Sequence, residues 1–350
     1  MANYTSAQDE YDEYDVLIEG DLPDDLEGLQ TTSCAPYDTR SLPVGPVPPL
    51  YAACGVAGLL GHTGLAFILV KCKGLRHMEN IYFLNLVISN LCFSLVLPFW
   101  TLTASHGEIL NDPMCKILAA LYSVGLYGEV LWNTLLAVQR YLVSCNVRRI
   151  STAARLPCRI MTSVLAWGTV ILFTLPEFML YTSQEGGQKI QCSFYGTSFL
   201  PADEPFWKKF LTLKMNILGF LFPLFVSLSC YLLTCQERRD NLFKLVFAIT
   251  VVFLLMWGPY NIVLFLATFK EYFSLHGCRS TYLLDRGVQI TKLLATSHCC
   301  VNLLLVVLLD KTVRQHLYSL CPWCGSTLTG HPQAPEYDSP QREHRCSSEV

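Results

Sequence analysis

Seven apolar stretches, each about twenty residues long, constrain this chain more than any other feature. A helix of roughly 20 residues crosses a hydrocarbon core of about 30 Å and satisfies its own backbone hydrogen bonds there. A β-barrel would instead show shorter segments of alternating polarity. The sequence therefore predicts an all-α membrane protein, a bundle of seven transmembrane helices followed by a short juxtamembrane eighth helix. The expected spans are 48–71, 80–103, 113–144, 157–180, 206–235, 241–268 and 285–309.

The segment before the first span is strongly acidic. Residues 9–27 contain ten Asp or Glu residues, and neither Lys nor Arg occurs before Arg40. Such a segment buries too little apolar surface to fold alone, so we expect a disordered extracellular tail. Because no apolar run marks a signal peptide, the first span is expected to direct insertion. The expected domains are the tail at 1–47, the bundle at 48–310, an amphipathic helix at 311–320 and a disordered cytoplasmic tail at 321–350.

Basic residues in the loops set the predicted orientation. Short loops rich in Lys and Arg stay on the cytoplasmic side of a membrane, and the loops after the first, third and fifth spans are basic. Seven spans then place the N-terminus outside the cell and the C-terminus in the cytoplasm, in a multi-pass protein of the cell membrane. The outer sequon makes Asn3 a predicted glycosylation site. The basic residues are Lys71, Lys73, Arg76, Arg140, Arg148, Arg149, Arg155, Arg159, Arg238, Arg239 and Lys244.

Sixteen cysteines divide according to this topology. Four face the outer, oxidising side, which predicts two disulfides and leaves three pairings open. Cys321 and Cys324 form a CxxC motif without further ligands at zinc-site spacing, so we predict palmitoylation of both and neither a metal site nor a cofactor. The four outer cysteines are Cys34, Cys115, Cys192 and Cys278.

Short motifs occur in several of the spans. They are Leu97-Pro98-Phe99-Trp100, Gln139-Arg140-Tyr141, Trp167, Pro223 with Tyr231, Met256-Trp257-Gly258-Pro259-Tyr260-Asn261, and His298-Cys299-Cys300-Val301-Asn302. Together they resemble the chemokine receptor group of rhodopsin-class G-protein-coupled receptors, over residues 34–320. The resemblance implies that Cys115 pairs with Cys192 and Cys34 with Cys278. It also implies a set of switch residues, namely Gln139, Arg140, Tyr141, Tyr231, Trp257, Pro259 and Asn302.

Four longer strings resemble an atypical branch of this group. They are residues 1–5, 14–20, 199–204 and 242–249. The resemblance implies a receptor that binds the chemoattractant protein chemerin and presents it to neighbouring cells, with little or no G-protein signalling. Its further expected partners are the lipid bilayer, C-C chemokines, arrestin and other chemokine receptors as heteromers, but no nucleic acid. The alternative is a C-C chemokine receptor coupled to G proteins and calcium release in leukocyte chemotaxis.

Two motifs depart from the pattern of the group. Receptors of this class usually carry an Asp before the Arg that ends the third span, and the ion pair restrains the resting state. Here Gln139 precedes Arg140, so Arg140 has lost this neighbour. The usual Asn-Pro-x-x-Tyr of the seventh span reads Asn-Leu-Leu-Leu-Val at 302–306. Without the proline, whose ring kinks helices, we expect a straighter, stiffer seventh helix with weak coupling to the cytoplasmic face. Sequence drift that the packing tolerates is the alternative.

Polar residues inside the spans form a predicted intramembrane cluster. Asn90 stands where the group has Asp, and Glu129 stands where the third span is usually small. Glu129, Asn133 and Arg140 share one helical face, and such residues are expected to point into the bundle. One hypothesis is a relocated sodium pocket at Glu129; the alternative, which we favour, is a protonated Glu129 that hydrogen-bonds Asn90. The cluster consists of His62, Asn90, Glu129, Asn133 and His298, with Asn302.

Ligand capture is expected to begin at the acidic tail. Tyrosines beside acids suit sulfation, and a negatively charged strand would attract a basic protein and accelerate its encounter. The alternative is a tail that only solubilises the chain. The tyrosines are Tyr4, Tyr11 and Tyr14.

A deeper pocket is implied by the resemblance, lined by Trp100, Tyr127, Trp257 and Lys292. Lys292 stands where chemokine receptors often have Glu, so the charge is reversed. This would suit a carboxylate, such as a peptide C-terminus, better than the amine of a chemokine N-terminus. A lysine that extends its ammonium group to the membrane surface is the alternative.

Other classes of membrane protein fit less well. A transporter or channel would lead us to expect internal repeats or broken paired helices. An intramembrane enzyme needs a nucleophile with a base or a metal motif such as H-E-x-x-H, which is missing from the sequence. We therefore predict a receptor and not an enzyme.

Overall fold

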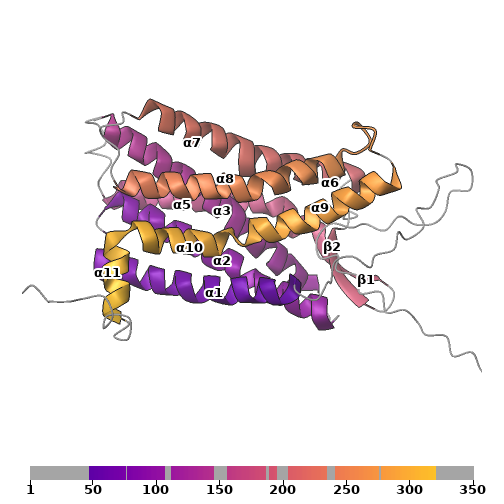
Figure 1. Ribbon diagram of the computed structural model, residues 1–350, viewed down its shortest axis with the longest axis horizontal. Coiled ribbons are helices and arrows are strands. Elements are labelled where there is room, and N and C mark those ends of the chain that lie inside the picture. Colours follow the sequence, from indigo (N-terminus) through magenta and orange to yellow (C-terminus); the bar gives the residue numbers. More distant parts are fainter. Residues whose placement is uncertain are drawn as a thin grey trace, which may run out of the picture.

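The computed structural model describes residues 47–75, 77–106, 112–145, 156–186, 189–194, 204–234, 241–275 and 277–320. Its long helices lie side by side, with a two-stranded sheet at one end and a short helix across the other (Figure 1). We call these the hairpin end and the α11 end. The elements are α1 (Val47–Ile68), η1 (Leu69–Lys73), α2 (Met78–His106), α3 (Asp112–Ser144), α5 (Leu156–Leu180), β1 (Tyr181–Gly186), β2 (Lys189–Phe194), α6 (Glu204–Asn216), η2 (Ile217–Leu221), α7 (Phe222–Leu233), α8 (Asn241–Thr268), α9 (Cys278–Thr296), α10 (His298–Leu309) and α11 (Lys311–Leu320).

Among the described residues, seven helical segments are long and apolar enough to cross a membrane, which confirms the predicted fold class. The seventh begins at Cys278, seven residues before the predicted start at 285. The sequence pattern marked only the apolar part of this helix, whereas its first turns carry polar side chains such as Arg279 and Ser280. The segments are Pro49–Lys73, Met78–Phe99, Asp112–Ser144, Arg159–Leu180, Pro205–Leu233, Asn241–Thr268 and Cys278–Leu309.

The seventh span is interrupted, so the expectation of a straighter helix is wrong. Its two parts, α9 and α10, meet at Ser297, whose ψ of −7° departs from helical geometry. Three consecutive side chains here contact the backbone carbonyl oxygen three residues earlier. The distances to that oxygen are 3.0 Å for Thr296 Oγ1, 2.8 Å for Ser297 Oγ and 2.6 Å for His298 Nδ1. Such bonds compete with the helical ladder and bend helices, which explains a break without proline.

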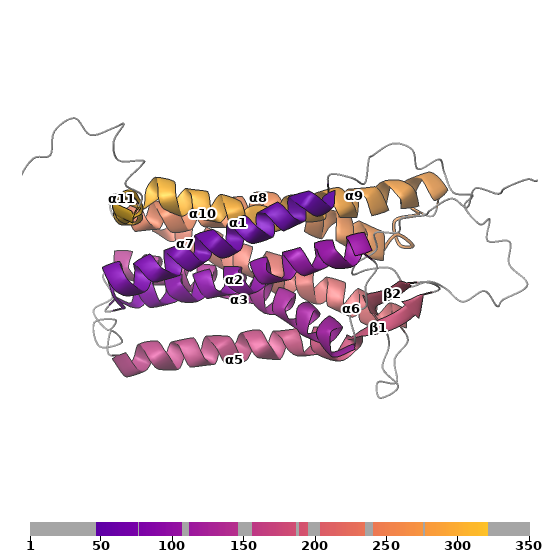
Figure 2. The same ribbon diagram turned by 90° about the horizontal axis from the view of Figure 1, so that it is seen from below.

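The third span occupies the centre of the bundle. Viewed from below, α3 runs obliquely between α2 and α5 (Figure 2), and it also packs against α7 and α8. The largest fully buried side chains of α3 are Trp132, Leu136 and Glu129. A polar residue on this helix therefore reaches the interior of the bundle and not the lipid.

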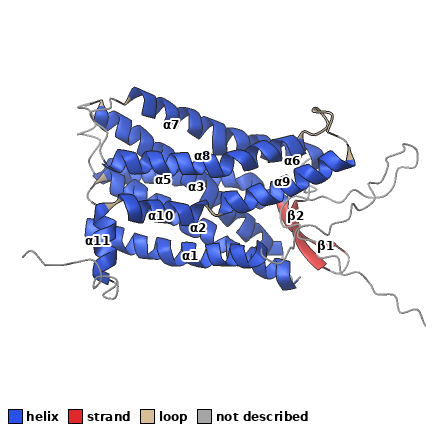
Figure 3. Ribbon diagram, in the orientation of Figure 1, coloured by secondary structure: helices blue, strands red, loops and turns tan. Residues whose placement is uncertain are grey.

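The two strands form an antiparallel hairpin, drawn red in Figure 3, with Tyr181 opposite Phe194. The Thr182 hydroxyl donates a hydrogen bond to the Asp112 carboxylate and so ties β1 to the start of α3. Burial raises the pKa of the Tyr181 hydroxyl, with smaller contributions from Glu177 and Tyr260, so it remains un-ionised at neutral pH.

Cys115 and Cys278 are each disulfide-bonded. The predicted partners are Cys192, whose side chain lies outside the described part, and Cys34, which lies outside the described residues. The pairings of Cys115 with Cys192 and of Cys34 with Cys278 therefore stay predictions.

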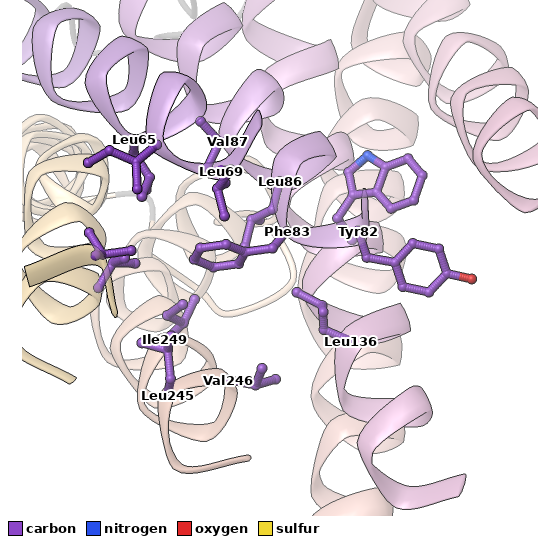
Figure 4. Packing of buried hydrophobic residues seen from close by; sticks show 14 of the residues in the cluster. Leu65, Leu69, Tyr82, Phe83, Leu86, Val87, Leu136, Leu245, Val246 and Ile249 are labelled. Atoms are coloured by element: carbon purple, nitrogen blue, oxygen red, sulfur yellow. The ribbon is translucent and has the colours of Figure 1, made fainter. Parts of the chain in front are cut away.

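Two apolar clusters fill the interior of the part of the chain that the structure describes. The cluster toward the α11 end brings together side chains of α1, α2, α3 and α8 (Figure 4). The second, toward the hairpin end, is built around Phe93, Trp257 and Tyr260. Figure 4 labels the following members of the first cluster: Leu65, Leu69, Tyr82, Phe83, Leu86, Val87, Leu136, Leu245, Val246 and Ile249.

Two glycines allow α3 to approach α2 closely. A Cβ on Gly125 would lie 2.7 Å from the Cβ and 2.8 Å from the backbone nitrogen of Phe93, and one on Gly128 would lie 2.4 Å from the Ser89 hydroxyl. Small residues at helix contacts let backbones pack closely in membranes, where the hydrophobic effect does not drive helix association. The position of α3, and of its polar side chains, depends on this contact.

We expect Gly125→Ala to lower the free energy of unfolding by about 1–3 kcal/mol, because the added methyl meets backbone atoms of Phe93. Gly168→Ala is the matched control, since a Cβ there has open space within 4 Å. Thermal unfolding of the purified full chain in lipid nanodiscs measures both. Equal midpoints for the two variants would contradict the close α2–α3 contact.

Candidate functional site

A cavity of about 80 Å³ opens between the helices toward the hairpin end. Its walls come from α3, α5, α6, α8 and α9, and Tyr181 of β1 completes them. The lining is aromatic and aliphatic with a few polar groups, as is usual in ligand sites. The lining residues are Ala119, Tyr122, Ser123, Leu126, Tyr127, Glu177, Tyr181, Leu211, Thr212, Met215, Tyr260, Leu264 and Lys292.

The predicted pocket residues are placed in different ways. Tyr127 and Lys292 line the cavity from different helices. Trp257 does not line it: its side chain is fully buried and contacts Tyr260, a residue of the cavity wall. The side chain of Trp100 lies outside the described part. Two of the four predicted residues are therefore brought together at one cavity.

An ion pair beside the cavity was not predicted from the sequence. The Lys214 ammonium donates to both carboxylate oxygens of Glu177 at 2.5 Å and to the Phe173 carbonyl at 2.8 Å. It also lies 5.0 Å from the centre of the Tyr127 ring, within reach of a cation–π interaction. Charged residues inside membrane spans are rare and often mark functional sites. Glu177 and Lys214 lie inside predicted spans, so the sequence could have indicated both as site residues.

Glu129 joins α3 to α10 in the middle of the bundle. One carboxylate oxygen accepts a hydrogen bond from the Asn302 amide at 2.7 Å, and the other contacts His298 Nε2. His298 Nδ1 lies 2.6 Å from the Ala295 carbonyl, so both ring nitrogens have a partner. Glu129 and His298 are 1% and 0% exposed, so this contact is shielded from solvent.

The expected hydrogen bond between Glu129 and Asn90 is wrong. The Asn90 amide donates instead to the Leu86 carbonyl of its own helix at 3.1 Å, and its oxygen lacks a partner among the described residues. The predicted cluster thus contains one tight group, formed by Glu129, His298 and Asn302.

The other two members of the predicted cluster have partners outside the group formed by Glu129, His298 and Asn302. His62 Nδ1 contacts the Gly58 carbonyl at 2.9 Å, and Asn133 donates to the Thr250 hydroxyl at 2.9 Å. His62 and Asn302 do share a small cavity of about 10 Å³ with Asn90. Among the described residues, His, Cys, Asp and Glu do not gather in threes in a way that would hold a metal ion.

Aromatic rings connect this polar group to the cavity. Trp257 lies edge-on to His298, with ring centres 5.4 Å apart, and edge-on to Tyr260 at 5.8 Å. Phe93 and Phe253 complete the shell around the two rings. A movement of Tyr260 in the cavity wall therefore has a direct packing route, through Trp257, to His298.

At the α11 end, Arg140 has a carboxylate partner after all. Its guanidinium forms an ion pair with Glu79 at 2.5 Å, and the Gln139 amide donates to the same carboxylate at 3.2 Å. The interpretation that Arg140 had lost its acidic neighbour is incomplete, because α2 supplies an acid that the chain order around Gln139 does not reveal.

The remaining switch residues lie on α3, α7 and α8. Tyr231 of α7 stacks on Phe247 of α8, with ring centres 4.0 Å apart. Pro259 lies within α8, and Tyr141 is half-buried directly after Arg140.

The tail tyrosines and the predicted modification sites lie outside the described residues and stay predictions; they are Tyr4, Tyr11, Tyr14, Asn3, Cys321 and Cys324.

Comparison with known proteins places this architecture in a family. Residues 64–304 match the model of the 7 transmembrane receptor (rhodopsin family). Chemokine C-C motif receptor-like 2 of Bos taurus is 53% identical over 354 residues, covering 99% of this chain and 100% of the relative. C-C chemokine receptor-like 2 of Homo sapiens is 54% identical over 91% of this chain and 90% of the relative. The Mus musculus protein of the same name is 45% identical over 96% of this chain and 94% of the relative.

The seven-helix bundle and its cavity thus define a membrane receptor, and the chain belongs to the rhodopsin family of G-protein-coupled receptors. Within this family it belongs with the C-C chemokine receptor-like 2 proteins. It is therefore a multi-pass membrane protein of a receptor family and not an enzyme. Receptors of this kind work with a ligand on one side and a G protein or arrestin on the other.

We expect Glu129→Leu to lower the free energy of unfolding by about 3–5 kcal/mol, because it leaves His298 and Asn302 buried without their partner. Glu129→Gln keeps an acceptor for Asn302 and should cost less. Glu271→Gln, which removes an exposed carboxylate, is the control. Thermal unfolding in nanodiscs measures all three.

The same assay tests the sodium hypothesis. Both oxygens of Glu129 already contact protein side chains, so we expect equal midpoints in sodium chloride and choline chloride at the same ionic strength. A stabilisation specific to sodium that disappears in Glu129→Gln would contradict this expectation and favour a sodium pocket.

Proposed function

We propose that this receptor binds chemerin at the cell surface and presents it to neighbouring cells, with little or no G-protein signalling. The observation that carries the proposal is that two polar switch residues, Asn302 and Arg140, are each bound by a carboxylate from another helix. Asn302 is bound to Glu129, and Arg140 is bound to Glu79. Helices tied in this way resist the separation that a G protein needs in order to insert between them.

The α11 end has a second tie that supports weak output. Lys73 of η1 forms an ion pair with Asp310, the residue between α10 and α11. Asp310 also accepts hydrogen bonds from the backbone nitrogens of Thr312 and Val313, at 3.0 and 3.1 Å, and so caps α11. The ends of the first and seventh spans are thereby joined at the same face of the bundle as Arg140.

The choice of chemerin rests on the resemblance of residues 1–5, 14–20, 199–204 and 242–249 to an atypical branch of the group. A sulfated acidic tail would attract a basic protein. The cavity then offers aromatic walls with the Lys292 ammonium for a carboxylate, such as a peptide C-terminus. C-C chemokines are the second ligand class, and heteromers with other chemokine receptors are further proposed partners.

For the orientation, we propose that the hairpin end faces the outside and the α11 end the cytoplasm. Basic side chains at the α11 end support it, since cytoplasmic loops are enriched in Lys and Arg. They include Lys71, Lys73, Lys244, Lys311 and Arg314. Glycosylation at Asn3 and palmitoylation at Cys321 and Cys324 are proposed on the same basis.

A second candidate is a signalling C-C chemokine receptor coupled to G proteins and calcium release in leukocyte chemotaxis. The packing route from Tyr260 through Trp257 to His298 favours it, because a ligand in the cavity would contact one end of that route. The two candidates share the fold and differ in the cellular response to a bound ligand.

We expect saturable chemerin binding to cells that express the full chain, with flat G-protein activation and a stable surface level measured in the same wells. Cells without the receptor give the background. Binding accompanied by an agonist-dependent signal would establish the signalling candidate instead. Complete absence of chemerin binding would overturn the proposed ligand and direct the search to C-C chemokines.

The cavity itself is tested by a charge deletion. We expect Lys292→Gln to weaken chemerin binding about tenfold, equivalent to about 1.4 kcal/mol, because Lys292 lines the cavity. Lys244→Gln is the control, since it removes an exposed positive charge at the α11 end. Equal affinities for the two variants would show that the cavity does not hold a ligand carboxylate.

A further inference from the structure

The ion pair at the α11 end joins two helices and not two neighbours in the chain. Glu79 is the second residue of α2, and its Oε2 atom accepts hydrogen bonds from Arg140 at 2.5 Å and from Gln139 at 3.2 Å. The Arg140 side chain is 8% exposed and that of Glu79 is 28% exposed. A pair so shielded is screened by salt much less than an exposed one.

The location of the acid decides what the pair restrains. A carboxylate at position 139 would belong to α3 and would move together with Arg140, so an ion pair within α3 does not fix that helix to its neighbour. Glu79 belongs to α2, and any displacement of the end of α3 relative to α2 must lengthen or break its bond to Arg140. The same carboxylate also binds Gln139, so both residues lose a partner if α3 moves.

The position of Glu79 within α2 suits a carboxylate that faces Arg140. It lies in the first turn of α2, where the partial positive charge of the helix end favours a negatively charged side chain. The close approach of α2 and α3 at Gly125 and Gly128 fixes the distance between the two helices. Arg140 therefore reaches the Glu79 carboxylate at the distance that the α2–α3 contact sets.

We propose that Glu79 is a positioning residue that holds Arg140 against α2 and thereby keeps the α11 end in its closed arrangement. It ties α3 to α2, a restraint that an acid at position 139 would not supply, because that acid would lie on α3 itself. The inference rests on the proposed function in one respect, namely that G-protein nucleotide exchange is low in the wild-type receptor. Whether the receptor binds chemerin does not affect it.

Four versions of the full chain, reconstituted in nanodiscs with a heterotrimeric G protein, test the proposal: wild type, Glu79→Gln, Gln139→Asp and the double variant. We expect Glu79→Gln to raise ligand-independent nucleotide exchange at least threefold, because Arg140 is released from α2. The double variant should keep the raised exchange of Glu79→Gln, since the carboxylate that Gln139→Asp adds lies on α3 and does not tie Arg140 to α2.

Glu271→Gln is the matched control, because it removes an acid whose ion pair with Lys209 lies at the other end of the bundle. Surface level and thermal midpoint are measured for every variant, and Glu79→Asp, which keeps the charge, serves if Glu79→Gln fails to fold. A lower midpoint for Glu79→Gln without increased exchange would show a merely structural tie and overturn the proposal. Exchange that returns to the wild-type level in the double variant would also overturn it, because a carboxylate on α3 would then be enough.

The outcome is separable from the proposed function. Chemerin binding to wild type and to Glu79→Gln is measured in parallel, and we expect the two affinities to agree because Glu79 lies far from the ligand cavity. Loss of binding in wild type overturns the choice of ligand and leaves the exchange result standing. Unchanged exchange in a folded Glu79→Gln variant overturns the positioning role and leaves the binding result standing.

Discussion

The hydrogen bonds of buried polar groups are the constraint on which the rest of this structure depends. A bilayer satisfies no backbone or side-chain polar group, so the chain must pair them itself. Helices pair the backbone, and three carboxylates pair buried side chains of neighbouring helices. Glu129 binds His298 and Asn302 in the centre, and Glu177 binds Lys214 beside the cavity. Glu79 binds Arg140 at the α11 end.

Two of these acids lie on a different helix from the one that carries the acid in the receptor group. In the centre, Asn90 of α2 lacks the acid and Glu129 of α3 carries it; at the α11 end, Gln139 of α3 lacks the acid and Glu79 of α2 carries it. A negative charge is thus retained at each level while its mechanical effect changes.

Much of the fold could be predicted from the sequence, because crossing a bilayer imposes length and polarity on each span. The candidate site was predictable in part. Tyr127 and Lys292 do line one cavity, but Trp257 lies beneath it, packed on Tyr260. The break at Ser297 was not predicted, since short side-chain bonds to nearby carbonyls bend a helix without any proline to mark the position.

By itself, the sequence determined the class of protein: a membrane receptor with seven spans, an acidic tail and altered switch motifs. Periodicity and polarity act along the chain, so they can be read along the chain. Only the tertiary structure decided which polar groups meet. Glu79 and Arg140 are separated by 61 positions, and Glu129 and Asn302 by 173, and their contacts depend on how closely and at what angle the helices pack. Helix packing is a property of surfaces in space, and the order of residues along one helix does not specify the neighbour that it will face.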